Sequence, residues 1–105
     1  ACTLSELFAA DWNGGSPTAG SGAVFDLRSN ALRPAGWTSA DAAGLPMLPL
    51  LARWDEAGTG RIRHALRITV PRTRNAYVFP ARHRAGDGTD PALPRMGERV
   101  RLKAS

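Results

Sequence analysis

The chain has 105 residues, of which 43% are hydrophobic and 22% are charged, and these proportions are typical of one globular domain. No apolar run approaches the roughly 20 residues of a membrane-spanning helix, so we expect no membrane partner. A single cysteine, Cys2, excludes an internal disulfide and a zinc site built from cysteines. We expect no cofactor and no bound metal.

Charge is distributed unevenly along the chain, which has a formal net charge of +5. Residues 1–52 contain two arginines and four acidic residues, whereas residues 53–105 contain twelve basic and five acidic residues. Most of the basic residues are arginines, which make paired contacts with carboxylate and phosphate groups. The basic second half therefore favours an acidic partner, although high genomic GC content also enriches a chain in arginine and alanine.

The first quarter of the chain predicts two strands separated by a loop. Residues 2–10, CTLSELFAA, have the composition of an opening strand. Residues 11–22 are rich in Gly, Ser, Pro and Asn, and this composition indicates an exposed loop. Residues 23–27, AVFDL, predict the second strand.

The middle of the chain predicts a short helical insert near residues 39–57. Thr38 or Ser39 could cap a first helix that runs to Ala43 and ends before Gly44. A second helix is expected over residues 49–57, because proline is favoured in the first turn of a helix and a glycine follows the segment.

From residue 61 the apolar period changes to two, which is typical of strands. Residues 61–70 and 76–83 predict a hairpin with its turn over residues 71–75, and residues 98–104 predict a last strand. We therefore expect a mainly β (α+β) fold: an antiparallel sheet or partly open barrel with the short helical insert, in a single domain over residues 1–105. One face of this sheet would be basic, with Arg61, Arg63, Arg67, Arg99, Arg101 and Lys103.

Four segments of the chain carry a resemblance to a known group of proteins. They are GSGAVFDLRSNALRPAGWTSADAAGLPMLP, RWDEAGTGRIRHALRITV, AYVFPARH and DPALPRMGERVRLKAS. Together they resemble the central portion of an uncharacterised family of secreted bacterial proteins from high-GC soil lineages. The resemblance implies a β-rich architecture, a secreted (extracellular) parent protein and a chain that is a fragment of a larger secreted domain. It implies no activity.

Cleavage of a glycosidic bond needs two suitably spaced carboxyl groups that act as acid and base. Asp26, Asp41 and Asp55 are the candidates for these catalytic groups. His83 lies at a predicted strand end, Trp12 lies in the exposed loop, where it could stack on a sugar ring, and Arg67 lies on the basic face; these three are the candidate substrate-binding residues. The sequence therefore predicts a polysaccharide-directed hydrolase.

Other functions use the same residues. The alternative to hydrolysis is a non-catalytic module that binds a carbohydrate or another acidic polymer with the basic sheet face. Ser39, His64 and an aspartate could form a hydrolytic triad, although the sequence around Ser39 lacks the G-x-S-x-G pattern. His64, His83 and a carboxylate could form a metal site, but their spacing does not favour one. We also expect self-association through exposed strand edges.

Overall fold

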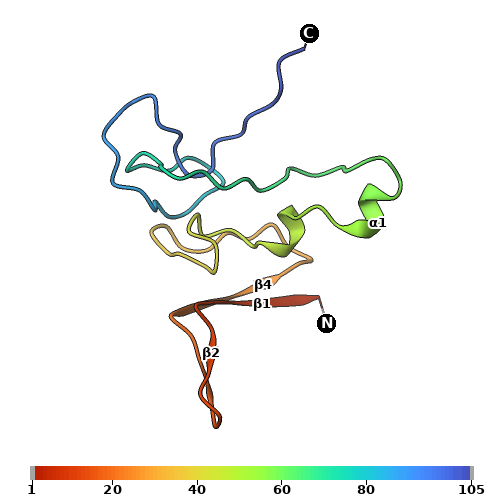
Figure 1. Cartoon of the computed structure of the whole chain (residues 1–105), viewed down its shortest axis with the longest axis vertical. Coiled ribbons are helices and arrows are strands. Elements are labelled where there is room, and N and C mark those ends of the chain that lie inside the picture. Colours follow the sequence, from red (N-terminus) through yellow and green to blue (C-terminus); the bar gives the residue numbers. More distant parts are fainter. Residues whose placement is uncertain (1, 105) are drawn as a thin grey trace.

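A computed structural model describes residues 2–104, and its regular secondary structure is mainly β (Figure 1). Among these residues the strands form antiparallel two-stranded sheets that do not close into a barrel, and one short α-helix follows them. The predicted mainly β fold with a short helical insert is thus confirmed. The elements in chain order are β1 (Thr3–Phe8), β2 (Asp11–Trp12), β3 (Pro17–Thr18), β4 (Ser21–Asp26), the 3-10 helix η1 (Leu48–Leu50) and α1 (Trp54–Ala57).

Strands β1 and β4 form the larger sheet, and both were predicted from the sequence. They pair in antiparallel register, with Leu4 opposite Phe25 and Glu6 opposite Ala23. Because side chains alternate between the two faces of a strand, these four residues share one face, which is the less exposed one. The other face is open to solvent and includes Val24, whose exposed fraction is 65%.

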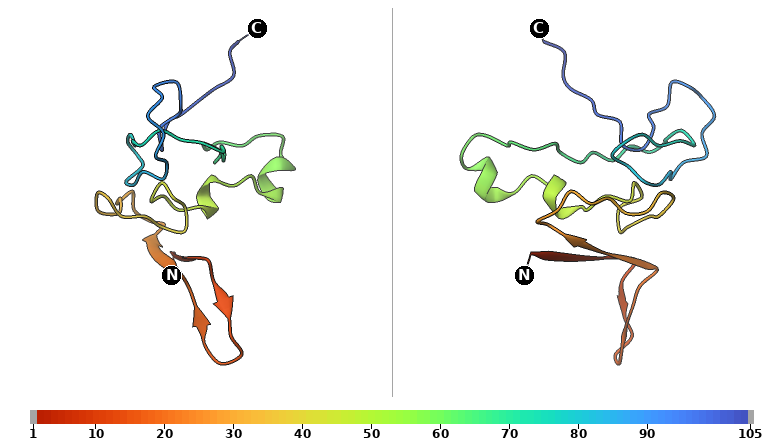
Figure 2. Two further views of the ribbon diagram at one scale, coloured as in Figure 1. Left: turned by 60° about the vertical axis from the view of Figure 1, so that its left-hand side comes forward. Right: turned by 180° about the vertical axis from the view of Figure 1, so that it is seen from behind.

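The segment predicted as an exposed loop, residues 11–22, is exposed but more ordered than expected. Asp11 pairs with Thr18 and Trp12 pairs with Pro17, so β2 and β3 form a small antiparallel hairpin. Gly14 has a φ of 74° in its turn, a conformation that glycine adopts without steric cost. The hairpin projects away from the rest of the molecule in every view (Figures 1 and 2).

The helix predicted over residues 38–43 is absent from the structure. The Ser39 hydroxyl accepts a hydrogen bond from the backbone N–H of Asp41 at 3.0 Å and lies 2.8 Å from the carbonyl oxygens of Asp41 and Leu45. A serine that bonds to nearby backbone groups competes with helix formation, and here the result is a buried turn. Gly44, with a φ of 75°, follows within this turn.

The second predicted helix, residues 49–57, is divided into η1 and α1. Leu51 and Arg53, which lie between the two, have extended backbone conformations that end one helix before the other begins. Each helical piece is only one turn long. The position of the predicted insert is correct, but its continuity is not.

The three-stranded sheet predicted for the second half does not form. Residues 61–70 are extended without a ladder partner, and the bridges in this half of the described chain are the isolated pairs Arg74↔Gly88 and Tyr77↔Met96. The chain turns at residues 78–81, where Ala81 donates to the carbonyl of Val78. Alternation of apolar residues favours an extended backbone, but a sheet also needs a partner in register.

The predicted basic sheet face is consequently absent as well. Residues 98–104 run away from the body of the molecule as an extended tail in each view (Figures 1 and 2). Arg99, Arg101 and Lys103 are exposed on this tail and do not lie on one sheet with Arg61 and Arg63.

The molecule is built as successive layers, with the β1–β4 sheet at one end, residues 28–57 next to it, and residues 61–96 beyond them (Figure 1). The buried apolar residues are Ala23, Ala43 and Ala81, so the layers meet through small side chains. The radius of gyration is 15.6 Å, compared with about 13 Å for a compact domain of this length. The molecule is therefore elongated.

Candidate functional site

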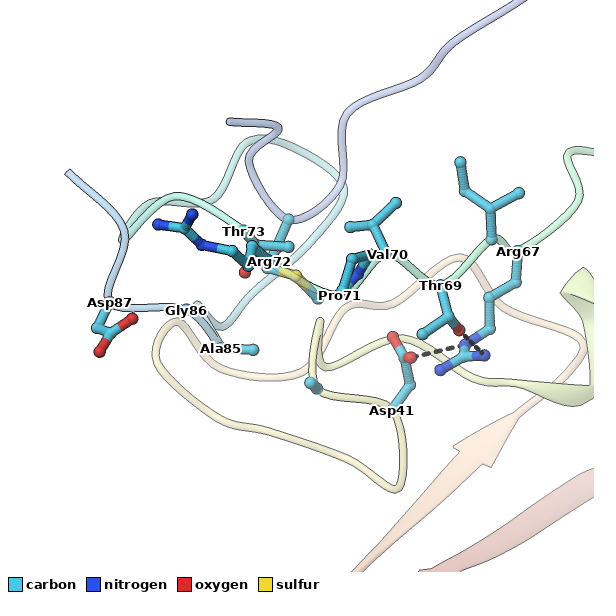
Figure 3. A pocket seen from close by; sticks show the side chains of 13 residues that line it. Asp41, Arg67, Thr69, Val70, Pro71, Arg72, Thr73, Ala85, Gly86 and Asp87 are labelled. Atoms are coloured by element: carbon cyan, nitrogen blue, oxygen red, sulfur yellow. Dashed lines mark hydrogen bonds and ion pairs between the residues drawn. The ribbon is translucent and has the colours of Figure 1, made fainter. Parts of the chain in front are cut away.

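A cleft of about 380 Å³ opens between the extended segment 67–73, the turn at residues 41–42 and the irregular segment 85–87 (Figure 3). Together with Met96, four parts of the chain that are distant in sequence contribute to one concave surface, as is usual for ligand sites. Polar and apolar side chains are interleaved around it. The lining residues are Asp41, Ala42, Arg67, Ile68, Thr69, Val70, Pro71, Arg72, Thr73, Ala85, Gly86, Asp87 and Met96.

The ion pair between Asp41 and Arg67 forms one end of the cleft. Nε of Arg67 donates to Oδ1 of Asp41 at 2.7 Å, and Nη1 of Arg67 donates to the hydroxyl of Thr69 at 3.1 Å. The second carboxylate oxygen of Asp41 accepts from the N–H of Ala43 at 3.1 Å. The Asp41 side chain is only 9% exposed, so this carboxylate is held rigidly by a charged and a neutral donor.

Other polar side chains in the cleft are less constrained. The hydrogen bonds among the lining side chains within residues 2–104 are those of Arg67, as Figure 3 shows. Arg72 and Asp87 are exposed at the cleft and Thr73 is half-buried there. Asp87 lies toward the end of the cleft opposite Asp41 (Figure 3). These side chains remain free to donate hydrogen bonds to a bound molecule and to accept hydrogen bonds from it.

The three predicted catalytic carboxylates do not meet in one cleft. Asp26 lies at the end of β4, where Nε of Arg28 donates to it at 3.0 Å, and hydrogen bonds from the Arg28 side chain and N–H lower the pKa of its carboxyl group. It lines a separate hollow of about 150 Å³. Asp55 lies in the first turn of α1 and contacts Arg53 at 3.4 Å. Only Asp41 lines the larger cleft.

The three predicted substrate-binding residues are also separated. Arg67 lines the cleft. His83 lies just behind it, because Nδ1 of His83 donates to the carbonyl of Ala42 at 2.9 Å and Ala42 is a lining residue. Trp12 is 66% exposed on the projecting β2–β3 hairpin, in a different layer of the molecule (Figure 1).

The two histidines have different surroundings. Nε2 of His64 donates to the Glu56 carboxylate at 3.0 Å and Nδ1 donates to the carbonyl of Ala65 at 2.9 Å. The bond to Ala65 and then the bond to Glu56 raise the pKa of His64, because each favours the protonated ring. The same carboxylate accepts from Arg53 at 2.8 Å. His64 therefore belongs to a surface cluster at α1, away from His83.

The triad and the metal site considered from the sequence find no support in this geometry. The Ser39 hydroxyl is buried and bonded to the backbone, and His64 bonds to Glu56 instead. Within residues 2–104 no three His, Cys, Asp or Glu side chains are grouped so that they could hold a metal ion. That part of the chain also has no helix long and apolar enough to span a bilayer.

Sequence reasoning did not identify Arg72, Thr73 and Asp87 as cleft residues. Arg72 and Thr73 were assigned to a hairpin turn, and Asp87 lies in a Gly-rich loop. The sequence feature that could have identified them is their position in predicted loops, since polar loop residues often form binding sites.

Comparison with known proteins adds no assignment, because no protein-family model, curated protein or solved structure matches the chain significantly. The resemblance to secreted bacterial proteins therefore stays a prediction.

Proposed function

We propose that the chain is a polysaccharide-binding module and that the Asp41–Arg67 cleft holds the sugar. The observation that carries this proposal is the arrangement of polar groups: one arginine is fixed by a buried carboxylate, while the side chains of Arg72 and Asp87 at the same cleft form no hydrogen bond within residues 2–104. Sugar hydroxyl groups both donate and accept hydrogen bonds, so they match a lining that contains both kinds of partner. The net charge of +5 favours an acidic polysaccharide.

Hydrolysis is the second candidate function, because Asp41 and Asp87 are two carboxylates that line the same cleft. Paired carboxylates could act as general acid and base on a glycosidic bond. Binding is favoured over hydrolysis because both oxygens of Asp41 already accept hydrogen bonds, from Arg67 and from the N–H of Ala43. A carboxylate held in this way is well suited to orient a guanidinium group toward a ligand.

Affinity electrophoresis through gels that contain neutral or acidic polysaccharides tests the binding proposal. We expect an acidic polysaccharide to retard the protein, and we expect Arg72→Ala to restore most of the lost mobility because it removes a cation from the cleft. Arg61→Ala is the matched control, because Arg61 is exposed and lies outside the cleft. Retardation by none of the polysaccharides, or equal effects of the cleft and control substitutions, would contradict binding in this cleft.

Release of reducing ends from the same polysaccharides separates hydrolysis from binding. If the second candidate is correct, Asp87→Asn abolishes release while Asp55→Asn does not. Retardation in the gels without any release would leave the chain as a binding module and exclude the hydrolase.

We further propose that the parent protein is secreted and that the chain self-associates through its strand edges. The family resemblance supports secretion. The pairing of β1 and β4 supports self-association, since within residues 2–104 each of these strands pairs only with the other. Each therefore leaves one edge on which another strand could pair.

A further inference from the structure

The free edge of β1 faces away from the body of the molecule. In Figures 1 and 2, β4 lies between β1 and the layer of residues 28–57, and β1 is the outer strand of the sheet. Strand β1 contains no proline and no bulge, which are two of the devices that protect a sheet edge. This edge is therefore accessible to a further strand.

The pairing with β4 determines which backbone groups point to that edge. Leu27 donates to the carbonyl of Cys2 at 2.7 Å, so these two residues form a hydrogen-bonded pair at the end of the ladder. Hydrogen-bonded and non-bonded pairs alternate in an antiparallel ladder. The next bonded pair is Leu4 with Phe25, and the N–H and C=O groups of Thr3, Ser5 and Leu7 consequently point to the free edge.

This alternation restricts how a second copy of β1 could pair with the first. In an antiparallel pair, a residue whose N–H and C=O groups point to the partner strand must lie opposite another residue of this kind. A two-fold axis must therefore pass through a residue rather than between two residues. Axes at Ser5 and at Glu6 both allow five residues of β1 to pair within the strand's bounds, Thr3–Phe8.

Charge distinguishes these two registers. An axis at Glu6 would place two glutamates directly opposite each other, which is destabilising. An axis at Ser5 places Thr3 opposite Leu7 of the second copy and Glu6 opposite Leu4, so no like charges lie directly opposite each other. We infer that two copies associate through β1 in antiparallel register with Ser5 opposite Ser5, which gives a four-stranded sheet in the order β4, β1, β1, β4. This inference rests on the proposed self-association.

Sedimentation of the wild-type protein across a wide concentration range tests the association, and a lysine at the axis tests its site. We expect dimers to form as concentration rises, and we expect Ser5→Lys to weaken the dimer about tenfold or more because two ammonium groups would lie opposite each other. Ser5 is exposed on the open face of β1, so the variant keeps its fold. Val24→Lys is the matched control, because Val24 lies beside Ser5 on the same face but on the other strand.

A cross-link tests the register. In a Cys2→Ser background, Ser5→Cys should form an intermolecular disulfide, because opposite residues have Cα atoms about 5.5 Å apart, within disulfide range. Thr3→Cys in the same background should not, since the two cysteines would lie roughly 14 Å apart.

These experiments test self-association and the β1 register separately. A strictly monomeric wild type at all concentrations would overturn the self-association itself. A dimer that is insensitive to Ser5→Lys, or that fails to cross-link at position 5, would overturn the β1 register and leave association through another edge.

Discussion

Oε1 of Glu6 lies 2.8 Å from the backbone nitrogen of Met47, a residue 41 positions further along the chain. The other carboxylate oxygen accepts from the same N–H at 3.0 Å, and Oε1 also accepts from the N–H of Leu48. Met47 is the N-cap of η1 and Leu48 is its first residue, so their N–H groups have no intrahelical acceptor, and the carboxylate satisfies both. One side chain of β1 thereby joins the sheet to the neighbouring layer.

Loss of this carboxylate should destabilise the protein. We expect Glu6→Ala to lower the free energy of unfolding by about 1–3 kcal/mol, because two backbone donors lose a charged acceptor. Glu6→Gln should cost less, since its amide oxygen can still accept. Urea denaturation measures both, with Asp11→Ala on the exposed hairpin as a control that should change little. Equal stability of Glu6→Ala and wild type would contradict a joining role for Glu6.

The partly buried ion pair between Asp41 and Arg67 also contributes to stability. We expect Asp41→Asn to lower the free energy of unfolding by about 1–3 kcal/mol, because Arg67, which is partly open to solvent, would lose its charged acceptor. Asp55→Asn, on the exposed surface of α1, should stay within about 0.5 kcal/mol of wild type. Thermal or urea unfolding compares the two variants directly. The prediction fails if both variants unfold together with the wild type.

His64 should make stability depend on pH. Both of its ring nitrogens face acceptors, so only the protonated ring satisfies Glu56 and the carbonyl of Ala65 together. The pKa of His64 is raised in the folded state, so its contribution is fully present below the unfolded pKa of about 6.5 and is lost as pH rises through the folded pKa.

Titration of the His64 ring resonances by NMR measures this effect. We expect Glu56→Gln to move the pKa of His64 downward, because the ring loses its carboxylate acceptor. Denaturation at several pH values should show that His64→Gln removes the loss of stability above about pH 6.5. A pKa of His64 that does not respond to Glu56→Gln would contradict the cause assigned to it.

Gly44 is the glycine whose replacement tests the packing of the central turn. A Cβ atom at this position would lie 2.5 Å from the carbonyl oxygen of Trp37 and 3.2 Å from Cβ of Arg82. Gly60 has a similar positive φ, 71°, but open space around it. Gly44→Ala should therefore destabilise the protein by at least about 1 kcal/mol more than Gly60→Ala, because it adds overpacking to the same backbone strain. Equal losses in urea denaturation would show that the turn is loose.

Local sequence patterns were sufficient to predict β1 and β4. Each strand has a nearby pairing partner, because a short hairpin joins the two. The same kind of pattern over residues 61–70 predicted a strand, but no segment of the described chain pairs with it, since extended backbone alone does not determine pairing. Ser39 had the correct residue type for a helix cap, yet its hydroxyl stabilises a turn instead.

The cleft could be predicted only in part. Asp41 and Arg67 were both selected from the sequence, but for different roles and without any sign that they bond across 26 residues. Such a contact depends on how the layers stack, which is a property of the whole chain. Asp87 comes to the same cleft through an irregular loop whose course no periodicity describes.

The small size of the buried apolar side chains has a thermodynamic consequence. The accessible surface of the molecule is 8032 Å², compared with about 5,700 Å² for an average folded monomer of this mass. Unfolding therefore exposes unusually little additional apolar area. Since that area determines the heat capacity increment, we expect an increment below the usual value of about 12–15 cal/mol/K per residue and a correspondingly flat stability curve. The isolated chain should melt over a broad temperature range, and cold should destabilise it little.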